Sequence, residues 1–284
     1  MTAVVETAEH MARRYALQQL EREIDNLEVD KFCPKDLQEL GFVLSDKTLI
    51  LSSKQASSLS YPTDLPVTPE DEFIECDFPE YSNRSGQEIE DTPIYHARKL
   101  KHYLGKYLVG SEYTYDRDSV WCYEDVHYYR LGPLWEYDYF PVGDEESVSP
   151  TRRPEWCASS IYHHRDTERV PHIKCIMIYD TDGDNNTLLR GELLALIRIM
   201  KGRLSTVCFV DHYIAPVMLF SIMGPQHARI IQGHFNVREL VVQYSKLYDF
   251  RRKKDAPLEL SARWFFGDPT GDTTTKNMHE EEGK

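Results

Sequence analysis

The chain has 284 residues, 41% of them hydrophobic, and carries a formal net charge of −14 at pH 7. This is enough apolar material for one large domain or two small ones with a sizeable core. The acidic charge disfavours nucleic acid as a partner, and no apolar run reaches the roughly 18 residues of a membrane span. Residues 1–6 lack the basic start and apolar stretch of a secretory signal. We therefore expect a soluble intracellular protein, cytoplasmic or nuclear, with no membrane partner.

Residues 1–56 are predicted to form an N-terminal helical segment. Within residues 3–27, apolar side chains recur at helical spacing between glutamates and arginines. They are Ala8, Ala12, Tyr15 or Ala16, Leu20, Ile24 and Leu27. This spacing predicts an amphipathic helix whose apolar stripe packs on the rest of the domain. The alternative is a helix that binds a partner or dimerises.

An acidic, irregular connection is predicted for residues 57–94, because prolines and carboxylates dominate there. The main α+β domain is expected to span residues 95–267. It opens with a basic helix over residues 95–107, in which Leu100 and Leu104 can share a buried face while Arg98 and Lys99 stay in solvent.

Aromatic residues are concentrated between residues 113 and 140, interleaved with carboxylates. Tyrosine and tryptophan offer an apolar body with a polar tip, so this segment could line a pocket for a flat organic ligand. The alternative is an aromatic layer packed on a sheet, with the carboxylates in solvent. The candidate ligand-binding residues are Tyr113, Tyr115, Asp116, Trp121, Tyr123, Asp125, His127, Tyr129 and Trp135.

The probable core lies between residues 171 and 250, where strongly apolar segments follow one another with short connections. A buried run predicts a strand over 173–179, and helical spacing predicts a helix over 189–204. Three runs rich in β-branched and aromatic residues predict antiparallel strands over 214–223, 228–235 and 239–247, and a helix follows over 257–266. The fold class is therefore α+β, with a largely antiparallel or mixed sheet, a packed helix and a βαβββα core.

The central helix shows a clear division between its faces. Leu193, Leu196 and Met200 share the apolar side, whereas Arg190, Arg198 and Lys201 are expected to point away from it into solvent. Beyond the core, residues 268–284 cannot bury apolar surface and are predicted to be a disordered tail. The six cysteines are widely scattered, so we expect reduced residues in or near the core.

Metal and cofactor motifs are weak in this chain. Asp180, Asp182 and Asp184 resemble the opening of a calcium loop, but Asn185 and Gly191 stand where that loop needs glycine and glutamate. No glycine-rich phosphate loop and no strained serine elbow is present. The sequence therefore predicts no metal and no cofactor, and it nominates no catalytic residue.

The last third of the chain carries a resemblance. The runs APVMLFSIMGPQHARIIQGHF (215–235), KLYDF (246–250) and WFFGDP (264–269) resemble a segment of uncharacterised proteins of filamentous fungi, which implies a fungal origin. The order of elements is also similar to the core of the PD-(D/E)xK nuclease superfamily. That likeness implies a magnesium ligand at Glu192, but the strands offer only Glu239 and place Lys246 after a glutamine and a tyrosine, so a site of this kind would be degenerate.

These observations favour a non-catalytic interaction or ligand-binding protein. Its partner would be another protein or a small organic ligand, and a homo-oligomer stays among the alternatives. The rival hypotheses are an enzyme that acts on a small organic molecule in the aromatic segment, with Tyr, His and Asp moving protons, and a degenerate nuclease-like protein.

Overall fold

A computed structural model of the chain describes residues 6–44, 76–81, 92–114, 121–124, 135–136, 154–166, 169–236 and 238–274. The predicted aromatic segment and the acidic connection lie largely outside these residues.

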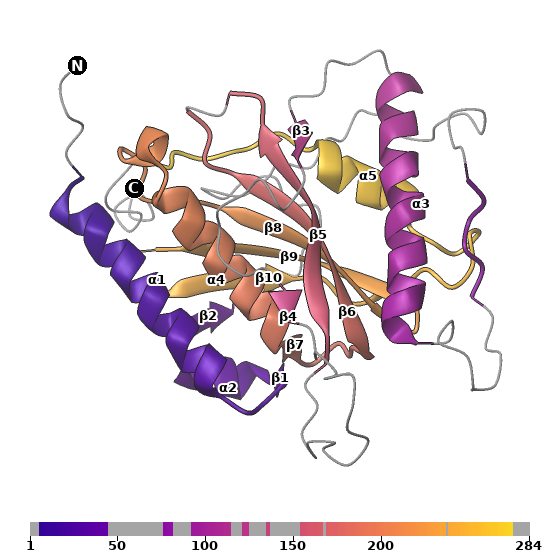
Figure 1. Cartoon of the computed structure of the whole chain (residues 1–284), viewed down its shortest axis with the longest axis horizontal. Helices are drawn as coiled ribbons and strands as arrows, with labels where there is room; N and C mark the ends of the chain where they lie inside the picture. Colours follow the sequence, from indigo (N-terminus) through magenta and orange to yellow (C-terminus); the bar gives the residue numbers. More distant parts are fainter. Residues whose placement is uncertain are drawn as a thin grey trace, which may run out of the picture.

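One mixed sheet organises the molecule (Figure 1). Its strands run in the order β2-β10-β9-β8-β6-β5-β3, with β11 paired to β9 and β4 paired to β5. The pairs β6/β8 and β2/β10 are parallel, and the other pairs are antiparallel. The strand bounds are β2 Phe42–Leu44, β3 Trp121–Glu124, β4 Trp135–Glu136, β5 Trp156–His164, β6 Ile173–Asp182, β8 Val217–Gly224, β9 His227–Phe235, β10 Leu240–Tyr244 and β11 Tyr248–Asp249. A separate antiparallel pair joins β1 (Lys31–Phe32) to β7 (Leu188–Leu189).

Helices cover both faces of the sheet. The bounds are α1 Ala8–Asn26, α2 Pro34–Glu39, α3 Pro93–Thr114, α4 Arg190–Leu204, α5 Leu258–Phe266 and the 3₁₀ turn η4 Val207–Phe209. Cys175 and Met177 of β6 join the apolar cluster under α4 and α1, whereas Ile176 and Ile178 join the cluster under α3 and α5. The unbroken apolar run of β6 is explained by this double burial, because alternate side chains enter opposite layers. None of the described helices combines the length and the apolar character that a membrane crossing requires.

The structure confirms the predicted α+β class and the βαβββα order of β6, α4, β8, β9, β10 and α5. The three strands β8, β9 and β10 form the expected antiparallel meander. The N-terminal segment does not stand apart from the main domain, since β2 pairs with β10 and β1 pairs with β7. The sequence missed these pairings because two- and three-residue strands leave almost no periodic signal.

Two arginines of α4 depart from the expectation. Arg190 and Arg198 are 2% and 7% exposed, although the sequence placed both in solvent. They are buried because α1 lies along that side of α4 and supplies carboxylates (Figure 1). Glu21 accepts a hydrogen bond of 2.8 Å from Arg198, and Asp25 accepts one of 2.9 Å from Arg190. The two helices are therefore joined by charge as well as by apolar contact.

The apolar stripe predicted for α1 packs inward only in its second half. In the first half, His10, Arg13 and Leu17 are buried, whereas the small apolar residues face outward. The reason is that this end of α1 packs on polar neighbours, and Arg13 stacks over the Tyr213 ring at 4.7 Å. The outward-facing apolar residues are Ala8, Met11, Ala12, Tyr15 and Ala16.

The predicted tail begins later than expected. Residues 268–274 are bound to the domain, since the amides of Tyr213 and Ile214 both donate to the carbonyl of Thr273. Sequence composition missed this because the contacts are made by backbone groups and polar side chains. Residues 275–284 lie outside the described part of the chain.

The described cysteines are free, as the sequence predicts. Cys175 is buried in β6, but Cys208 is exposed on η4 and does not contribute to the core. The side chain of Cys122 is outside the described set.

Candidate functional site

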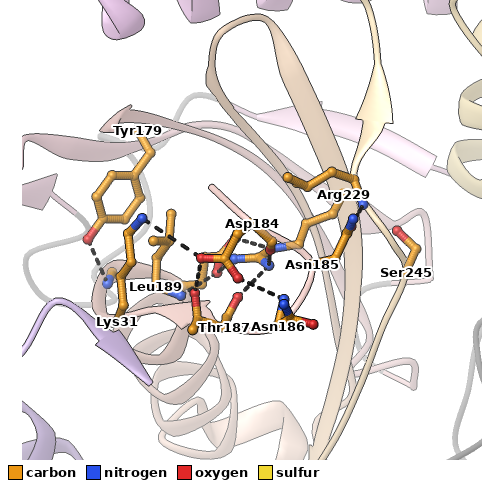
Figure 2. A network of polar contacts seen from close by, with 12 residues as sticks. Lys31, Tyr179, Asp184, Asn185, Asn186, Thr187, Leu189, Arg229 and Ser245 are labelled. Carbon is orange, nitrogen blue, oxygen red and sulfur yellow. Dashed lines mark hydrogen bonds and ion pairs between the residues drawn. The ribbon is translucent and has the colours of Figure 1, made fainter. Parts of the chain in front are cut away.

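The strongest candidate site lies at the carboxyl ends of the parallel strands β6 and β8. Proteins with parallel strands usually bind ligands at this edge, near a reversal of strand order. Here the loop 183–187, the first turn of α4 and the start of β9 gather around one polar network (Figure 2). The strand β6 leads into this loop, and the loop leads directly into β7 and α4.

An ion pair between Glu192 and Arg229 forms the centre of the network. Both side chains are 0% exposed, and Arg229 donates to the two carboxylate oxygens at 2.8 Å and 2.5 Å. Glu192 reaches this position because it stands in the first turn of α4, where its carboxylate also accepts the Leu189 amide at 2.7 Å. Arg229 donates further to the carbonyls of Thr187 (2.6 Å) and Asp184 (3.1 Å). The carboxylate of Glu192 and the guanidinium of Arg229 are thus hydrogen-bonded to each other and to the backbone of the same segment.

Two carboxylates of the calcium-like loop, Asp180 and Asp184, have separate partners. Asp180 accepts the amide of Ile94 at 3.0 Å, so it caps the start of α3. Asp184 accepts from the hydroxyl of Thr187 at 2.6 Å, and these bonds hold the pKa of its carboxyl below the ordinary value. Lys31 donates to the backbone carbonyl of Asp182 at 2.8 Å. Among the described residues, no three His, Cys, Asp or Glu side chains are grouped so that they could hold a metal ion.

The thermal midpoint of unfolding should therefore not depend on divalent cations. We expect the same midpoint with chelator and with added calcium, magnesium or zinc, because Asp180 and Asp184 already serve backbone and side-chain donors. Differential scanning calorimetry measures this directly. A rise of many degrees with one ion, lost in Asp184→Asn, would show that the loop binds that ion.

The floor beneath the network is tightly packed. Gly191 donates its amide to the Tyr179 hydroxyl at 3.2 Å. A Cβ atom added at Gly191 would lie 2.6 Å from Trp156 and 2.7 Å from Tyr179, both fully buried. There is no space here for a further methyl group.

Gly191→Ala should lower the free energy of unfolding by about 1–3 kcal/mol, the usual cost of forcing extra volume into a packed core. Chemical denaturation of the variant checks this value. Gly105→Ala is the matched control, since a Cβ at that helical position of α3 meets nothing within 4 Å. Equal stability of the two variants would contradict the close packing of the floor.

The residues implied by the nuclease resemblance are not brought together. Glu192 bonds Arg229, which lies beyond the Tyr244 end of β10, because Tyr244 pairs with Ile231. Glu239 is exposed and precedes the opposite end of β10. Arg229 and Phe235, the partner of Leu240, are roughly 20 Å apart along β9 at the usual rise of a strand, so Glu192 and Glu239 belong to opposite ends of this strand pair.

Of the predicted aromatic site, the structure describes one side chain, Trp121. It lies on β3, is 7% exposed and joins the apolar cluster under α3 and α5, and its indole donates to the carbonyl of Gly267 at 3.0 Å. Tyr113, Tyr123 and Trp135 fall on α3, β3 and β4, but their side chains are outside the described set. Tyr115, Asp116, Asp125, His127 and Tyr129 lie wholly outside the described residues.

A second polar cluster, which the sequence did not indicate, lies at the other end of β6. Lys174 is fully buried and donates to the carbonyls of Trp264, Phe265 and Gly267 at the end of α5, at 3.1, 2.5 and 2.7 Å. Its ammonium also lies 3.8 Å from the centre of the Trp121 ring. Burial lowers the pKa of Lys174. Three acceptors for three ammonium protons, together with the negative end of a helix dipole, oppose that effect.

The chemistry available in the described residues is therefore mainly structural. The buried carboxylate, arginine and lysine are each occupied by partners within the fold. Neither a family model, nor a curated protein, nor a solved structure matches this chain.

Proposed function

We propose that this protein is a non-catalytic interaction protein, which binds an apolar segment of a protein partner through the outer side of α1 and η4. The observation that carries the proposal is the exposure of large apolar side chains on these two neighbouring elements. Met11 and Tyr15 on α1 are 38% and 58% exposed, and Val207 on η4 is 77% exposed. Exposed apolar groups of this kind, gathered in one place, are typical of interaction surfaces.

The segment around η4 lies beside the first half of α1. Arg14 donates to the Ser205 hydroxyl at 3.5 Å, and the hydroxyls of Thr7 and Tyr213 share a hydrogen bond of 3.3 Å. These contacts hold the segment around η4 beside the first half of α1. Because Met11 and Tyr15 are one helical turn apart, they present a single ridge on the outer side of α1. We call Met11, Tyr15 and Val207 the α1 patch.

The use of α1 also supports a binding role. In its first half, His10 and Arg13 are buried, whereas Met11, Ala12 and Tyr15 face solvent. A helix with no partner on its outer side would normally expose polar residues there. The polar network at the ends of β6 and β8 also supports a non-catalytic role. A catalytic acid or base must be able to reach a substrate, whereas Glu192 and Arg229 are buried and bonded to each other.

Site-specific photocrosslinking tests this proposal. A photoreactive phenylalanine analogue in place of Tyr15 should give an adduct of defined mass in cells, and Met11→Glu in the same chain should abolish it. The same analogue in place of His102, an exposed residue of α3, is the matched control. Absence of any Met11-dependent adduct would overturn the proposal.

A ligand screen addresses the rival enzyme hypothesis. A small molecule present at about 100 times its Kd stabilises a protein by roughly 2.7 kcal/mol, which raises the melting temperature by several degrees. We expect no such rise with nucleotides, organic acids or aromatic metabolites. A reproducible rise with one of them would favour a small-molecule site over a protein-binding one.

A further inference from the structure

The segment 267–274 lies across the amino ends of β6 and β8, and we call it the carboxyl-terminal strap. At its beginning, the carbonyl of Gly267 accepts hydrogen bonds from Lys174 and from Trp121. Near its end, the carbonyl of Thr273 accepts the amides of Tyr213 and Ile214, at 2.8 and 3.3 Å. Between these anchors, the strap is held by imidazoles.

Two buried histidines bind the strap. His172 is only 3% exposed, and its Nε2 donates to the carbonyl of Thr270 at 3.2 Å. His212 shares a hydrogen bond of 2.6 Å between Nδ1 and the Thr273 hydroxyl, and it is 7% exposed. The remaining ring nitrogen of His172, Nδ1, is buried without a hydrogen-bond partner. A proton placed there would create a charged donor with nothing to accept it.

The groups that surround these imidazoles are mostly basic. His172 is next to Lys174 on β6 and is also influenced by His164 on β5 and by His212. His212 is influenced by Arg203 of α4 and His10 of α1, while Asp211 and Asp272 favour its charged form. Burial is the largest effect for both residues and lowers both pKa values, that of His172 to about 3. Both imidazoles are therefore neutral in the docked strap at neutral pH.

We propose that the strap is a pH-operated latch, which is closed at neutral pH and released from the amino ends of β6 and β8 as the pH falls. In the docked state the histidines resist protonation, whereas an undocked strap leaves them in water with an ordinary pKa of about 6.5. Below that value the released state binds more protons than the docked state. Proton linkage then favours release by up to roughly tenfold per histidine for each pH unit, and no such effect exists above it.

Two carboxylates with strongly shifted pKa values, Glu6 and Asp249, do not produce this response in the same range. Glu6 and Asp249 have pKa values lowered to about 2 by hydrogen bonds from Arg14 and Arg251 respectively, so both stay ionised above pH 5. A change between pH 7.5 and pH 5.5 is the change expected of histidines, and substitution of His172 and His212 assigns it to these two.

Hydrogen exchange followed by NMR on the full chain at pH 7.5 and 5.5 tests the latch, after correction for intrinsic exchange rates. The amides of Tyr213 and Ile214 report strap docking directly, because they donate to Thr273. We expect their protection to fall at least tenfold at pH 5.5, with no change in α4. Equal protection at both pH values, or a parallel loss in α4, would overturn the proposal.

Two substitutions separate titration from packing. His172→Gln keeps an amide donor for Thr270 but cannot take up a proton in this range, and His212→Gln does the same at Thr273. Each single variant should lose part of the pH response, and the double variant should lose nearly all of it. His102→Gln, at an exposed position of α3, should respond like the unmodified chain. Should the double variant fail to fold, an undiminished pH response in both single variants would be enough to refute the latch.

Discussion

Arg229→Met is expected to lower the free energy of unfolding by about 3–5 kcal/mol, the usual cost of leaving one member of a buried ion pair without its partner. The substitution removes both hydrogen bonds to Glu192 and both bonds to the carbonyls of Asp184 and Thr187. Glu192 would stay fully buried with its charge uncompensated. Urea unfolding at pH 7 measures the loss.

A second substitution should then restore stability. In Glu192→Gln combined with Arg229→Met, the buried charge is absent while an amide oxygen can still accept from Leu189. We expect this double variant to be more stable than Arg229→Met alone, although it carries more changes. Arg251→Met is the matched control, since Arg251 pairs with Asp249 at the surface and its removal should cost less than about 1 kcal/mol. A double variant less stable than Arg229→Met would contradict the buried-pair account.

Leu196→Ala is expected to lower the free energy of unfolding by about 2–5 kcal/mol, because it opens a cavity between α4 and the sheet. Leu196 is 0% exposed and lies against β9, where a Cβ atom added at Gly233 would be 3.2 Å from its Cδ2. The residue therefore fills the space between α4 and the sheet. Guanidinium unfolding with an unchanged m-value would show that stability alone has changed.

The control for this prediction is Val207→Ala, which shortens an apolar side chain that is 77% exposed. It should change stability by less than about 0.5 kcal/mol, as surface substitutions usually do. Similar losses for Leu196→Ala and Val207→Ala would mean that α4 is not the central element of the core.

The central part of the fold could be predicted from the sequence because its signals are local. The apolar run of β6, the helical spacing of Leu193, Leu196 and Met200, and the short connections between β8, β9 and β10 each identify an element by itself. Short connections also fix antiparallel neighbours, so the meander follows from the same information.

The remaining parts depend on partners that are distant in the chain. Whether Arg198 is buried depends on Glu21, which is 177 positions away. The inward face of α1 is set by Tyr213 and α4, so a helix with alanines on one side was assigned the wrong buried face at its start. Lys174 gives no signal in sequence either, because a lysine in an apolar run could equally end at solvent.

The candidate site shows the same limit. Glu192 was singled out by the resemblance to the nuclease core, but the sequence could not show that Arg229 of β9 forms an ion pair with it. The carboxylates of residues 180–184 have the spacing of a cation site. In the structure, however, Asp180 accepts a hydrogen bond from the amide of Ile94, and Asp184 accepts one from the hydroxyl of Thr187. Motif spacing identifies residues that lie close together, and tertiary packing decides whether they face one another.

The most direct test of the account compares the polar network with the α1 patch in one measurement. The photoreactive analogue at Tyr15 is introduced into the double variant Glu192→Gln, Arg229→Met and into Met11→Glu, each first shown by hydrogen exchange to retain a protected α4. If the network is structural and the patch binds the partner, the double variant should form the same adduct as the unmodified chain, and Met11→Glu should form none. A folded double variant that loses the adduct, beside a Met11→Glu variant that keeps it, would show that the function belongs to the network and would contradict the account.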